Sequence, residues 1–281
     1  MIKAREWWVA SLLSLFMPGL GQIYNGQARK GFILIFLPLL IFPLYPLCLE
    51  VGNIVYPLVI YFLVTIAFYI YVVRDALVTA KKIKNEYVLK KYNRVSIYVC
   101  IIIFVGIMNT GLTEYIKNNH IQAFKIPSRS MEPTLLSGDH LLVDRNTSKI
   151  TYIRGDIVVF EFPEDPTKDY IKRIVGIGGD KLSIKDKVVY INGEPINEPY
   201  VVYKNDDPNS FGFKKGRNFG PITVPEGHFF VIGDNRDNSF DSRYFGPIEQ
   251  SKIKGIVKTI YWSWDKKTKS IRWDRIGLKT E

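Results

Sequence analysis

The chain has 281 residues, a formal net charge of +11 and 47% hydrophobic residues. Its basic residues are densest in RDALVTAKKIKNEYVLKKYNR, residues 74–94, which lies between two apolar segments. Because nucleic-acid-binding domains carry a basic stripe on a folded surface, this pattern favours membrane topology and excludes nucleic acid as the expected partner. Both cysteines lie in apolar segments, so we expect no disulfide in the folded part.

The first apolar stretch, WWVASLLSLFMPGLGQIYNGQ, is interrupted by a proline and two glycines. One interpretation is a cleavable secretory signal, because Lys3 and Arg5 precede a short apolar core. However, no small-x-small cleavage site follows before the next apolar segment. We therefore predict that residues 1–30 form a short membrane-associated or re-entrant helical hairpin, which neighbouring protein would cover at membrane depth.

Three later segments contain no charged side chain and are long enough to cross a bilayer: 31–49, 51–73 and 95–113. The alternative is that these segments are buried helices of a soluble protein. Three such helices in so short a stretch of chain make this alternative improbable. The positive-inside rule places the basic run in the cytoplasm. We predict two transmembrane helices and a basic cytoplasmic loop over 31–94, then an anchor helix over 95–115 that leads out of the cytoplasm.

Residues 116–281 have a different pattern. Short alternating apolar runs such as HLLVDR, GDIVVFEF and HFFVIGD are separated by Gly, Pro, Asn and Asp. This spacing is typical of antiparallel strands joined by turns, and the Asn-Gly of VVYINGEPI predicts a hairpin. The fold class expected is a mainly β extracytoplasmic domain of antiparallel sheets, preceded by N-terminal α-helical transmembrane segments.

The segment KIPSRSMEPTLLSGDHLLV places two candidate nucleophiles, Ser128 and Ser130, just before a strand. Serine attacks a carbonyl only when a base removes its proton. The chain has three histidines, His120, His140 and His228, and each is placed as a structural or exposed residue would be. His140 and His228 stay open as alternative bases. With so few histidines and no cysteine nearby, the sequence does not support a zinc site.

A buried lysine is the other possible base, since burial lowers the pKa of an amine. Lys172 lies in DYIKRIVGIGGD among Ile171, Ile174 and Val175. From the pattern alone it is equally consistent with a lysine at a strand edge that faces water. The segment GDNRDNSFDSRYFG, 233–246, is either a polar surface loop or a rigid hydrogen-bonded platform. The apolar run HFFVI that leads into it favours the platform.

Three of these segments resemble the boxes of type I signal peptidase, also called leader peptidase. They are PSRSMEPTL at 127–135, YIKRIVGIGGD at 170–180 and GDNRDNSFDSR at 233–243. They occur in the family's order and spacing, and the resemblance covers roughly residues 95–281. One departure is Gly178, where the family commonly has proline. This loosens a turn by about 1 kcal/mol or less and changes no catalytic atom.

The resemblance implies a role for each matching residue. Ser130 matches the acylating nucleophile, and Lys172 matches the general base. Ser128 matches the hydroxyl that joins the Ser130 backbone N–H in the oxyanion hole, and Ser239 matches the serine that orients the lysine. The remaining matches form a supporting polar network and small apolar substrate pockets: Asp241, Arg243 and Arg173 in the network, and Phe124, Ile126, Leu135 and Ile171 in the pockets.

The function implied is that of a membrane-bound serine endopeptidase. It would remove N-terminal signal peptides from exported preproteins after a small residue, through an acyl-enzyme, without metal or cofactor. The resemblance also implies a multi-pass protein of the bacterial cytoplasmic membrane with its catalytic domain outside. Its partners would be signal peptides and the lipid bilayer, with the protein-export channel as a neighbour. Activity should rise with pH as Lys172 loses its proton.

Other interpretations remain at this point. A specialised serine–lysine maturation protease of the same clan would differ mainly in substrate, whereas a self-cleaving repressor does not fit the membrane spans. A non-catalytic, membrane-tethered binding domain would require Ser130 and Lys172 to lie far apart. Near the C-terminus, Trp262, Trp264 and Trp273 are either membrane-interface residues or ordinary aromatic side chains.

Overall fold

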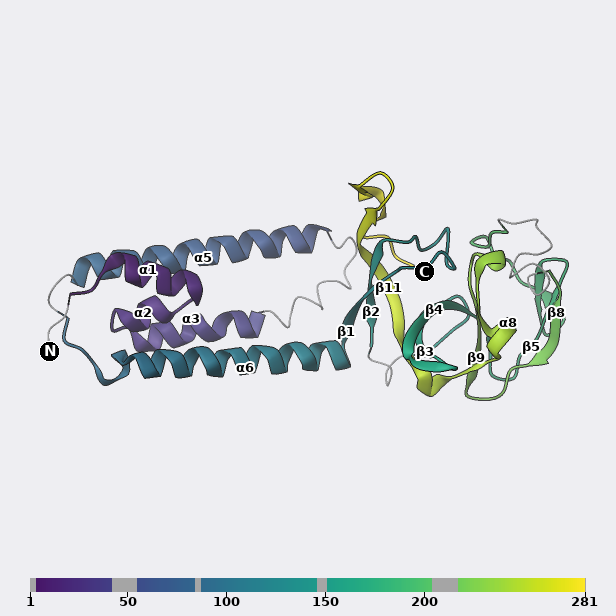
Figure 1. The fold of residues 1–281 in the computed structure, drawn as a ribbon, viewed down its shortest axis with the longest axis horizontal. Helices are drawn as coiled ribbons and strands as arrows, with labels where there is room; N and C mark the ends of the chain where they lie inside the picture. The colour runs from purple at the N-terminus through teal and green to yellow at the C-terminus, as the bar shows by residue number, and fades with distance from the viewer. Residues whose placement is uncertain (1–3, 42–54, 84–86, 146–150, 204–216, 281) are drawn as a thin grey trace. The chain divides into compact units, whose positions relative to one another are not determined.

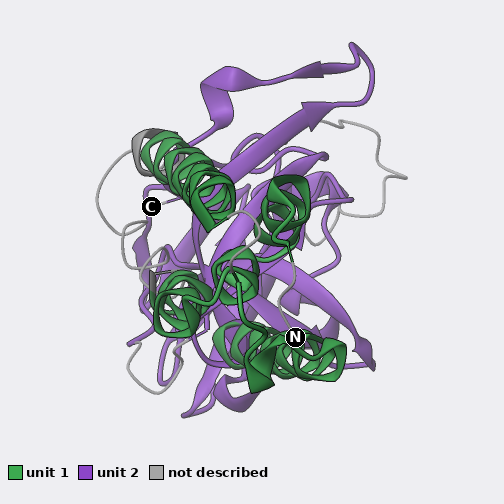
Figure 2. Cartoon of the chain, turned by 90° about the vertical axis from the view of Figure 1, so that its left-hand side faces the viewer, with its two compact units in different colours: residues 1–116 green, residues 117–281 purple. Residues whose placement is uncertain are grey.

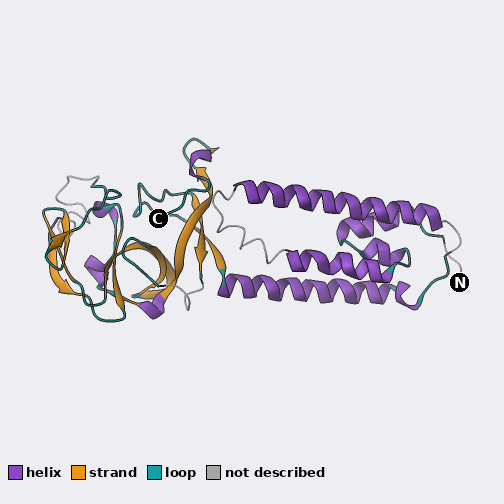
Figure 3. Ribbon diagram, turned by 180° about the vertical axis from the view of Figure 1, so that it is seen from behind, coloured by secondary structure: helices purple, strands orange, loops and turns teal. Residues whose placement is uncertain are grey.

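The computed structural model describes residues 4–41, 55–83, 87–145, 151–203 and 217–280 (Figure 1). The chain divides into two compact units, Met1–Ile116 and Lys117–Glu281, which are coloured separately in Figure 2. The first unit is helical and the second consists mainly of strands, as the colours of Figure 3 show. The fold class expected from the sequence, antiparallel sheets preceded by apolar helices, is confirmed.

In its described residues, the helical unit contains three shorter helices, two long helices and one turn of 3-10 helix. They are α1 Trp7–Phe16, α2 Leu20–Tyr24, α3 Ala28–Ile41, α5 Val55–Ile83, η2 Lys91–Asn93 and α6 Val95–Asn119. Among the residues that the structure describes, two helical stretches are long and apolar enough to cross a membrane, Val59–Ile83 of α5 and Val95–Asn119 of α6. The third expected span, 31–49, is helical as far as Ile41, and its remainder lies outside the described residues.

The prediction that residues 74–94 form a loop is wrong for residues 74–83, because α5 continues to Ile83. Two physical reasons account for this. The segment RDALVTAKKI is rich in Ala, Leu and Lys, which are strong helix formers. In addition, Ala76 and Ala80 are fully buried, because α1 packs along this part of α5. Helix propensity and packing together carry the helix into the basic run.

A polar clamp joins the Gly-Gln-x-x-Asn motif of α2 to α5. The Gln22 side-chain amide donates to the Val72 carbonyl (2.8 Å) and to the Asp75 carboxylate (3.1 Å). Asn25 donates to the Ala76 carbonyl at 2.7 Å, and Lys30 pairs with Asp75 at 2.6 Å. Buried amides with backbone partners fix the relative position of two helices, because each would lose hydrogen bonds if they separated.

Gly21 allows this close approach. A Cβ at Gly21 would lie 2.2 Å from both the Ala10 carbonyl oxygen and the Ser14 hydroxyl oxygen, and 3.0 Å from the Ala76 Cβ. Small residues of this kind let helix backbones approach closely in a membrane, where packing replaces the hydrophobic effect between helices. Residues 7–24 therefore form the short helical hairpin that the sequence suggested, and its place in a membrane stays a prediction.

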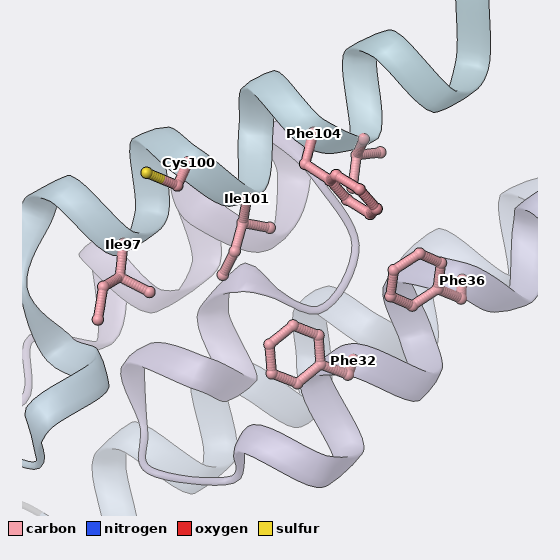
Figure 4. Close-up of a pocket in the computed structure, with 7 residues that line it drawn as sticks. Phe32, Phe36, Ile97, Cys100, Ile101 and Phe104 are labelled. Atoms are coloured by element: carbon pink, nitrogen blue, oxygen red, sulfur yellow. The ribbon is translucent and has the colours of Figure 1, made fainter. Parts of the chain in front are cut away.

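An apolar pocket lies between α3 and α6 (Figure 4). Its lining consists of Phe32, Phe36, Ile97, Cys100, Ile101, Phe104 and Val105. These residues all belong to the helical unit, and none of them is a candidate site residue. We therefore assign the pocket no part in the chemistry.

The second unit is built from two antiparallel sheets. The larger has the order β1-β2-β11-β3-β4-β9-β10, with β12 paired to β11, and the smaller has the order β7-β6-β5-β8. The larger sheet contains β1 Ile121–Lys125, β2 Asp139–Asp144, β3 Ile157–Phe162, β4 Asp165–Ile177, β9 His228–Ile232, β10 Ile248–Glu249, β11 Ile253–Asp265 and β12 Ser270–Ile271. The smaller contains β5 Lys181–Lys185, β6 Val188–Ile191, β7 Glu194–Pro195 and β8 Phe219–Thr223.

The alternating runs of the sequence become these strands because each places one apolar face against a core. In β2, for example, the side chains alternate between buried and partly buried along its length. The Asn-Gly pair forms the expected hairpin: Ile191 and Glu194 pair across a two-residue turn, and Asn192 (φ 55°) and Gly193 (φ 92°) both take positive φ. That backbone is the one that two-residue hairpins prefer.

The described part of the second unit also contains short helical turns: η3 Arg236–Asn238, α8 Ser242–Phe245, η4 Gln250–Lys252 and η5 Trp273–Arg275. Of these, η3 and α8 follow β9 and carry the polar segment 233–246. Two clusters of buried apolar side chains lie in the larger sheet. A third, built around Leu182 and Phe230, packs the smaller sheet against β4 and β9. The polar segment is thus attached to a packed core through β9.

Candidate active site

Ser130 lies in the connection between β1 and β2, and its residue is 7% exposed. Backbone hydrogen bonds close this connection at its base, from the Ile126 N–H to the Asp139 carbonyl (2.8 Å) and from the Gly138 N–H to the Ile126 carbonyl (2.9 Å). Met131 and Leu135 anchor it in the apolar core beneath. Because the connection is held at both ends and in the middle, the Ser130 side chain has a fixed position.

Lys172 lies on β4 and is 4% exposed. Its Nζ is 2.9 Å from the Ser130 Oγ, to which it donates when protonated, and it also donates to the Ile171 carbonyl at 3.0 Å. The two residues are 42 positions apart in the chain. The binding-domain interpretation, which requires these side chains to be far apart, is therefore not supported.

Burial changes the ionisation of this lysine. It lowers the pKa of Lys172 from 10.5 to about 8, because the charged amine is removed from water. The carboxylate of Asp241 acts in the opposite direction, and the guanidinium of Arg243 adds to the lowering. A substantial fraction of Lys172 is therefore neutral near physiological pH, which is the state required of a base.

Ser128 is exposed, and its Oγ lies 3.3 Å from the Ser130 Oγ. A hydroxyl at this distance can reach an oxygen that forms on the carbon attacked by Ser130. The two serines and the lysine thus meet on one side of the β1–β2 connection. The resemblance to the signal peptidase boxes implied roles for these three residues in one site.

The polar segment 233–246 is internally hydrogen-bonded. Arg243 holds Asp241 through two contacts of 2.8 Å, and the Gly233 N–H donates to the same carboxylate at 3.0 Å. Burial alone would raise the pKa of Asp241, but the charge and hydrogen bonds of Arg243, with the bond from Ser239, outweigh it and lower this pKa. Asp241 is therefore a fixed negative charge.

Ser239 does not make the hydrogen bond expected of it. The resemblance implies that its hydroxyl bonds to the lysine, whereas here it donates to the Asp241 carboxylate at 2.6 Å. A carboxylate is a stronger acceptor than a neutral amine, which explains the preference. Ser239 is 1% exposed, and a Cβ at Gly233 would be 2.3 Å from its Oγ and 2.5 Å from the Ser130 carbonyl oxygen. Its described hydrogen bond is thus to the carboxylate, whereas the Lys172 amine bonds to Ser130 and Ile171.

Arg173 forms the other part of the polar network. Its guanidinium binds Asp234 with two hydrogen bonds of 2.9 and 2.8 Å, and both side chains are at most 5% exposed. It also donates to the Gly155 carbonyl at 2.7 Å, and Asp234 accepts from the Thr134 hydroxyl at 2.5 Å. This pair connects β4, next to Lys172, with the turn that follows β9.

Sequence reasoning missed two residues of this network, Asp234 and Asn235. The Asn235 N–H donates to the Ser130 carbonyl at 3.1 Å, and its side-chain amide donates to the Arg129 carbonyl at 3.1 Å. Both residues lie in the segment that the sequence marked as a polar platform. That density of polar side chains after an apolar strand was the available signal, but it did not show which member would face the nucleophile.

The four residues expected to line substrate pockets lie in one apolar cluster. Ile126 and Leu135 belong to its buried core, with 3% and 0% exposure, and Phe124 and Ile171 pack against it while partly exposed. The structure thus brings them together close to Ser130. Phe124 and Ile171 present accessible surface, whereas Ile126 and Leu135 lie beneath.

The alternative bases have other partners. His140 Nδ1 is 3.4 Å from the Tyr261 hydroxyl, and burial lowers its pKa. His228 Nδ1 is 3.0 Å from the Glu226 carbonyl, and His120 is exposed at the start of the second unit. Among the described residues, Lys172 is thus the titratable group that hydrogen-bonds to the Ser130 hydroxyl.

A serine hydroxyl held against a buried lysine amine is an arrangement that can activate the serine as a nucleophile. Comparison with known proteins then gives the family. The family description "Signal peptidase, peptidase S26" matches residues 93–262. The chain therefore belongs to the signal peptidase family, peptidase S26.

Individual relatives agree. The chain is 35% identical over 143 residues to signal peptidase I of Bacillus licheniformis, covering 50% of this chain and 76% of the relative. It is 30% identical over 248 residues to signal peptidase I of Pseudomonas fluorescens, covering 72% and 83%. A crystal structure of a signal peptidase I from Enterococcus faecalis is 32% identical, covers 38% of this chain and 97% of that one, and has a TM-score of 0.33.

Proposed function

We propose that this protein is a membrane-bound type I signal peptidase, a serine endopeptidase that removes N-terminal signal peptides from exported preproteins. The proposal rests on family membership and, at the site, on the 2.9 Å contact between the Lys172 amine and the Ser130 hydroxyl. Burial of Lys172 supports the same assignment, because it lowers the pKa of the amine into the range in which a base works.

In the proposed mechanism, neutral Lys172 accepts the Ser130 proton while the Ser130 oxygen attacks the scissile carbonyl carbon. The Ser128 hydroxyl and the Ser130 backbone N–H stabilise the oxyanion. Protonated Lys172 then gives its proton to the leaving amine as the carbon–nitrogen bond breaks and an ester to Ser130 remains. Water, deprotonated by Lys172, hydrolyses that ester and restores the free serine.

The network residues have positioning roles in this proposal. Asp241, Arg243 and Ser239 hold the turn beside the dyad, and Arg173 with Asp234 holds β4 against it. Phe124 and Ile171 present apolar surface to the substrate residues that precede the cut, and Ile126 and Leu135 support that surface from below.

The proposed setting is the bacterial cytoplasmic membrane. Residues 31–94 and 95–115 would cross it in several passes, residues 1–30 would lie within or on it, and residues 116–281 would be extracytoplasmic. The two helices of membrane-spanning length and the seven basic residues of 74–94 support this orientation. Signal peptides, lipid and the nearby export channel would be its partners.

The test is cleavage of a model preprotein in detergent by the full chain and by Ser130→Ala and Lys172→Ala. We expect the wild type to cut after a small residue, and both variants to lose nearly all activity while they remain folded by circular dichroism. Retained activity in Lys172→Ala would return His140 and His228 as candidate bases. A wild type that binds the preprotein without cutting it would contradict the proposed function.

A further inference from the structure

Residues 198–203, which follow β7, form a strap across the turn that carries the polar network. The strap is attached through its backbone: the Val202 N–H donates to the Asp234 carbonyl at 2.9 Å, and the Arg236 N–H donates to the Val202 carbonyl at 3.0 Å. These two bonds make a parallel bridge between Val202 and Asn235. The strap thus contacts the segment whose backbone binds Ser130.

A buried ion pair forms the first side-chain attachment. Glu198 Oε1 lies 2.6 Å from Arg236 Nη2, and the two side chains are 7% and 1% exposed. Arg236 also donates from Nε to the Gly233 carbonyl at 3.2 Å. An ion pair so far from water fixes geometry strongly, because removal of one partner leaves the other charge buried and unpaired.

The ring of Tyr200 forms the second attachment. The Arg173 guanidinium carbon lies 3.9 Å from the centroid of this ring, the geometry of a cation–π contact. The Tyr200 hydroxyl donates to Glu198 Oε1 at 3.1 Å, so the two attachments are joined. Arg173 follows Lys172 directly on β4. The ring of Tyr200 therefore covers the guanidinium that holds this strand in place beside the proposed base.

The two attachments reach different members of the proposed dyad. Glu198 acts on Arg236, and Arg236 flanks Asn235, whose N–H holds the Ser130 carbonyl at 3.1 Å. Tyr200 acts on Arg173, which ties β4 to Asp234 and the Gly155 carbonyl next to Lys172. We propose that Glu198 and Tyr200 are positioning residues for this peptidase. Glu198 fixes the position of the nucleophile, and Tyr200 fixes the position of the base. This inference rests on the proposed function.

The strap can have this positioning role because the contact between Ser130 and Lys172 is sensitive to small displacements. A serine and a base must stay within hydrogen-bond distance for proton transfer, and misplacement by about 1 Å can reduce the rate about 100-fold. Nothing in the local sequence of EPYVVY indicates such a role. It becomes visible only because the strap, the turn after β9 and β4 meet in the folded domain.

The test uses the full chain in detergent and a preprotein substrate, with kcat and KM measured per folded molecule across the pH range. For Tyr200→Leu we expect kcat to fall about 10-fold or more with KM within about 2-fold. Its pH midpoint should also move upward, because a displaced β4 packs less tightly around Lys172, whose burial lowers its pKa. Tyr200→Phe keeps the ring over Arg173 and should behave as the wild type.

Glu198→Gln tests the other attachment. We expect kcat to fall about 10-fold while the pH midpoint stays unchanged, since this residue acts on the serine and not on the lysine. Matched controls are Tyr190→Leu, at a tyrosine on β6 of the small sheet, and Glu194→Gln, at an exposed glutamate on β7. Both should leave kcat and the midpoint unchanged.

The outcomes separate this inference from the function on which it rests. If Ser130→Ala and Lys172→Ala abolish cleavage but Tyr200→Leu and Glu198→Gln match the wild type in kcat per folded molecule, the strap inference is wrong and the function stands. If the strap variants only reduce the folded fraction, with kcat and midpoint unchanged, their role is structural and the inference also fails. Activity that survives in Ser130→Ala would instead overturn the proposed function.

Discussion

At the scale of single residues, the site depends on the amine of Lys172, which is buried where its charged form is unfavourable. Lys172 is almost entirely buried, and its Nζ contacts one hydroxyl and one carbonyl. Asp241, whose carboxylate acts to raise the pKa of Lys172, is paired with Arg243 and not with the lysine. Burial without a direct carboxylate partner is what lowers the pKa of this lysine, and the first two predictions follow from it.

The first prediction concerns the pH dependence of cleavage. Only neutral Lys172 accepts a proton, so kcat/KM should rise about tenfold per pH unit below its pKa of about 8 and level off above it. The measurement is kcat/KM for a short peptide between pH 5 and 10. An optimum below about pH 6 would contradict a lysine base.

The second prediction concerns stability. The pKa of Lys172 is lower in the folded chain than the ordinary 10.5 of an unfolded chain, so the folded state binds fewer protons between about pH 8 and 10.5. Its stability is therefore reduced below pH 8 and recovers as the pH rises through that window. Replacement by an apolar side chain of similar length, Lys172→Met, should raise the free energy of unfolding at pH 7 by up to roughly 3 kcal/mol.

Urea unfolding at pH 7 and pH 10 would measure this effect. The gain from Lys172→Met should shrink at the higher pH, where the wild-type lysine is largely neutral. Lys181→Met, at an exposed lysine on β5, is the control and should change little at either pH. An equal gain at both values would show that packing, and not charge, accounts for the difference.

The third prediction tests the oxyanion contact. Because the Ser128 hydroxyl is 3.3 Å from the Ser130 Oγ and exposed, Ser128→Ala removes one donor without disturbing a core. We expect kcat to fall about 10²–10³-fold with little change in KM. Ser137→Ala, in the same connection, is the control. A Ser128→Ala variant as active as the wild type would remove this serine from the mechanism.

Residue-level prediction from the sequence had a clear limit. The resemblance to the signal peptidase boxes assigned roles to the serines and the lysine, whereas the pattern alone left the place of Lys172 open. Neither provided the partner of Ser239 or the contact of Asn235 with the Ser130 backbone. Those depend on how a turn 100 or so residues downstream packs against the β1–β2 connection, and hydrogen-bond partners of that kind are decided by tertiary geometry.

At the scale of elements, the strands were predictable and the helix ends were less so. Alternation of apolar and polar residues marked β2, β3, β9 and β11, because one face of each strand must be buried. The end of α5 could not be read from hydropathy, because its last two turns are charged. Packing of Ala76 and Ala80 against α1 extends the helix, and no local pattern reports such a contact.

The fourth prediction belongs to these helices. Gly21→Ala would place a Cβ 2.2 Å from the Ala10 carbonyl oxygen, so α1 and α2 would have to separate and the polar clamp to α5 would weaken. We expect a lower midpoint for thermal unfolding of the helical unit in detergent, followed by helical circular dichroism. Gly106→Ala, on α6 where a Cβ would meet nothing within 4 Å, should leave the midpoint unchanged or slightly raised. Equal midpoints for both variants would contradict the close contact.

At the scale of the whole molecule, every residue of the proposed dyad and its network belongs to the second compact unit. The fifth prediction is that residues 117–281, produced alone, fold and cleave a short soluble peptide with a kcat within about tenfold of the full chain. The unit contains no cysteine, so its unfolding curve should be identical with and without a thiol reductant. A folded fragment that cuts nothing would show that the helical unit takes part in the chemistry.

The strand order of the larger sheet also decides when, during synthesis of the chain, the proposed site can form. β11, the last long strand in the chain, lies between β2 and β3 at the middle of the sheet. The β1–β2 connection with Ser130 and the β4 strand with Lys172 therefore have no common sheet until β11 has left the ribosome. The proposed serine–lysine site can therefore form only after the chain has been made through β11, which ends at Asp265.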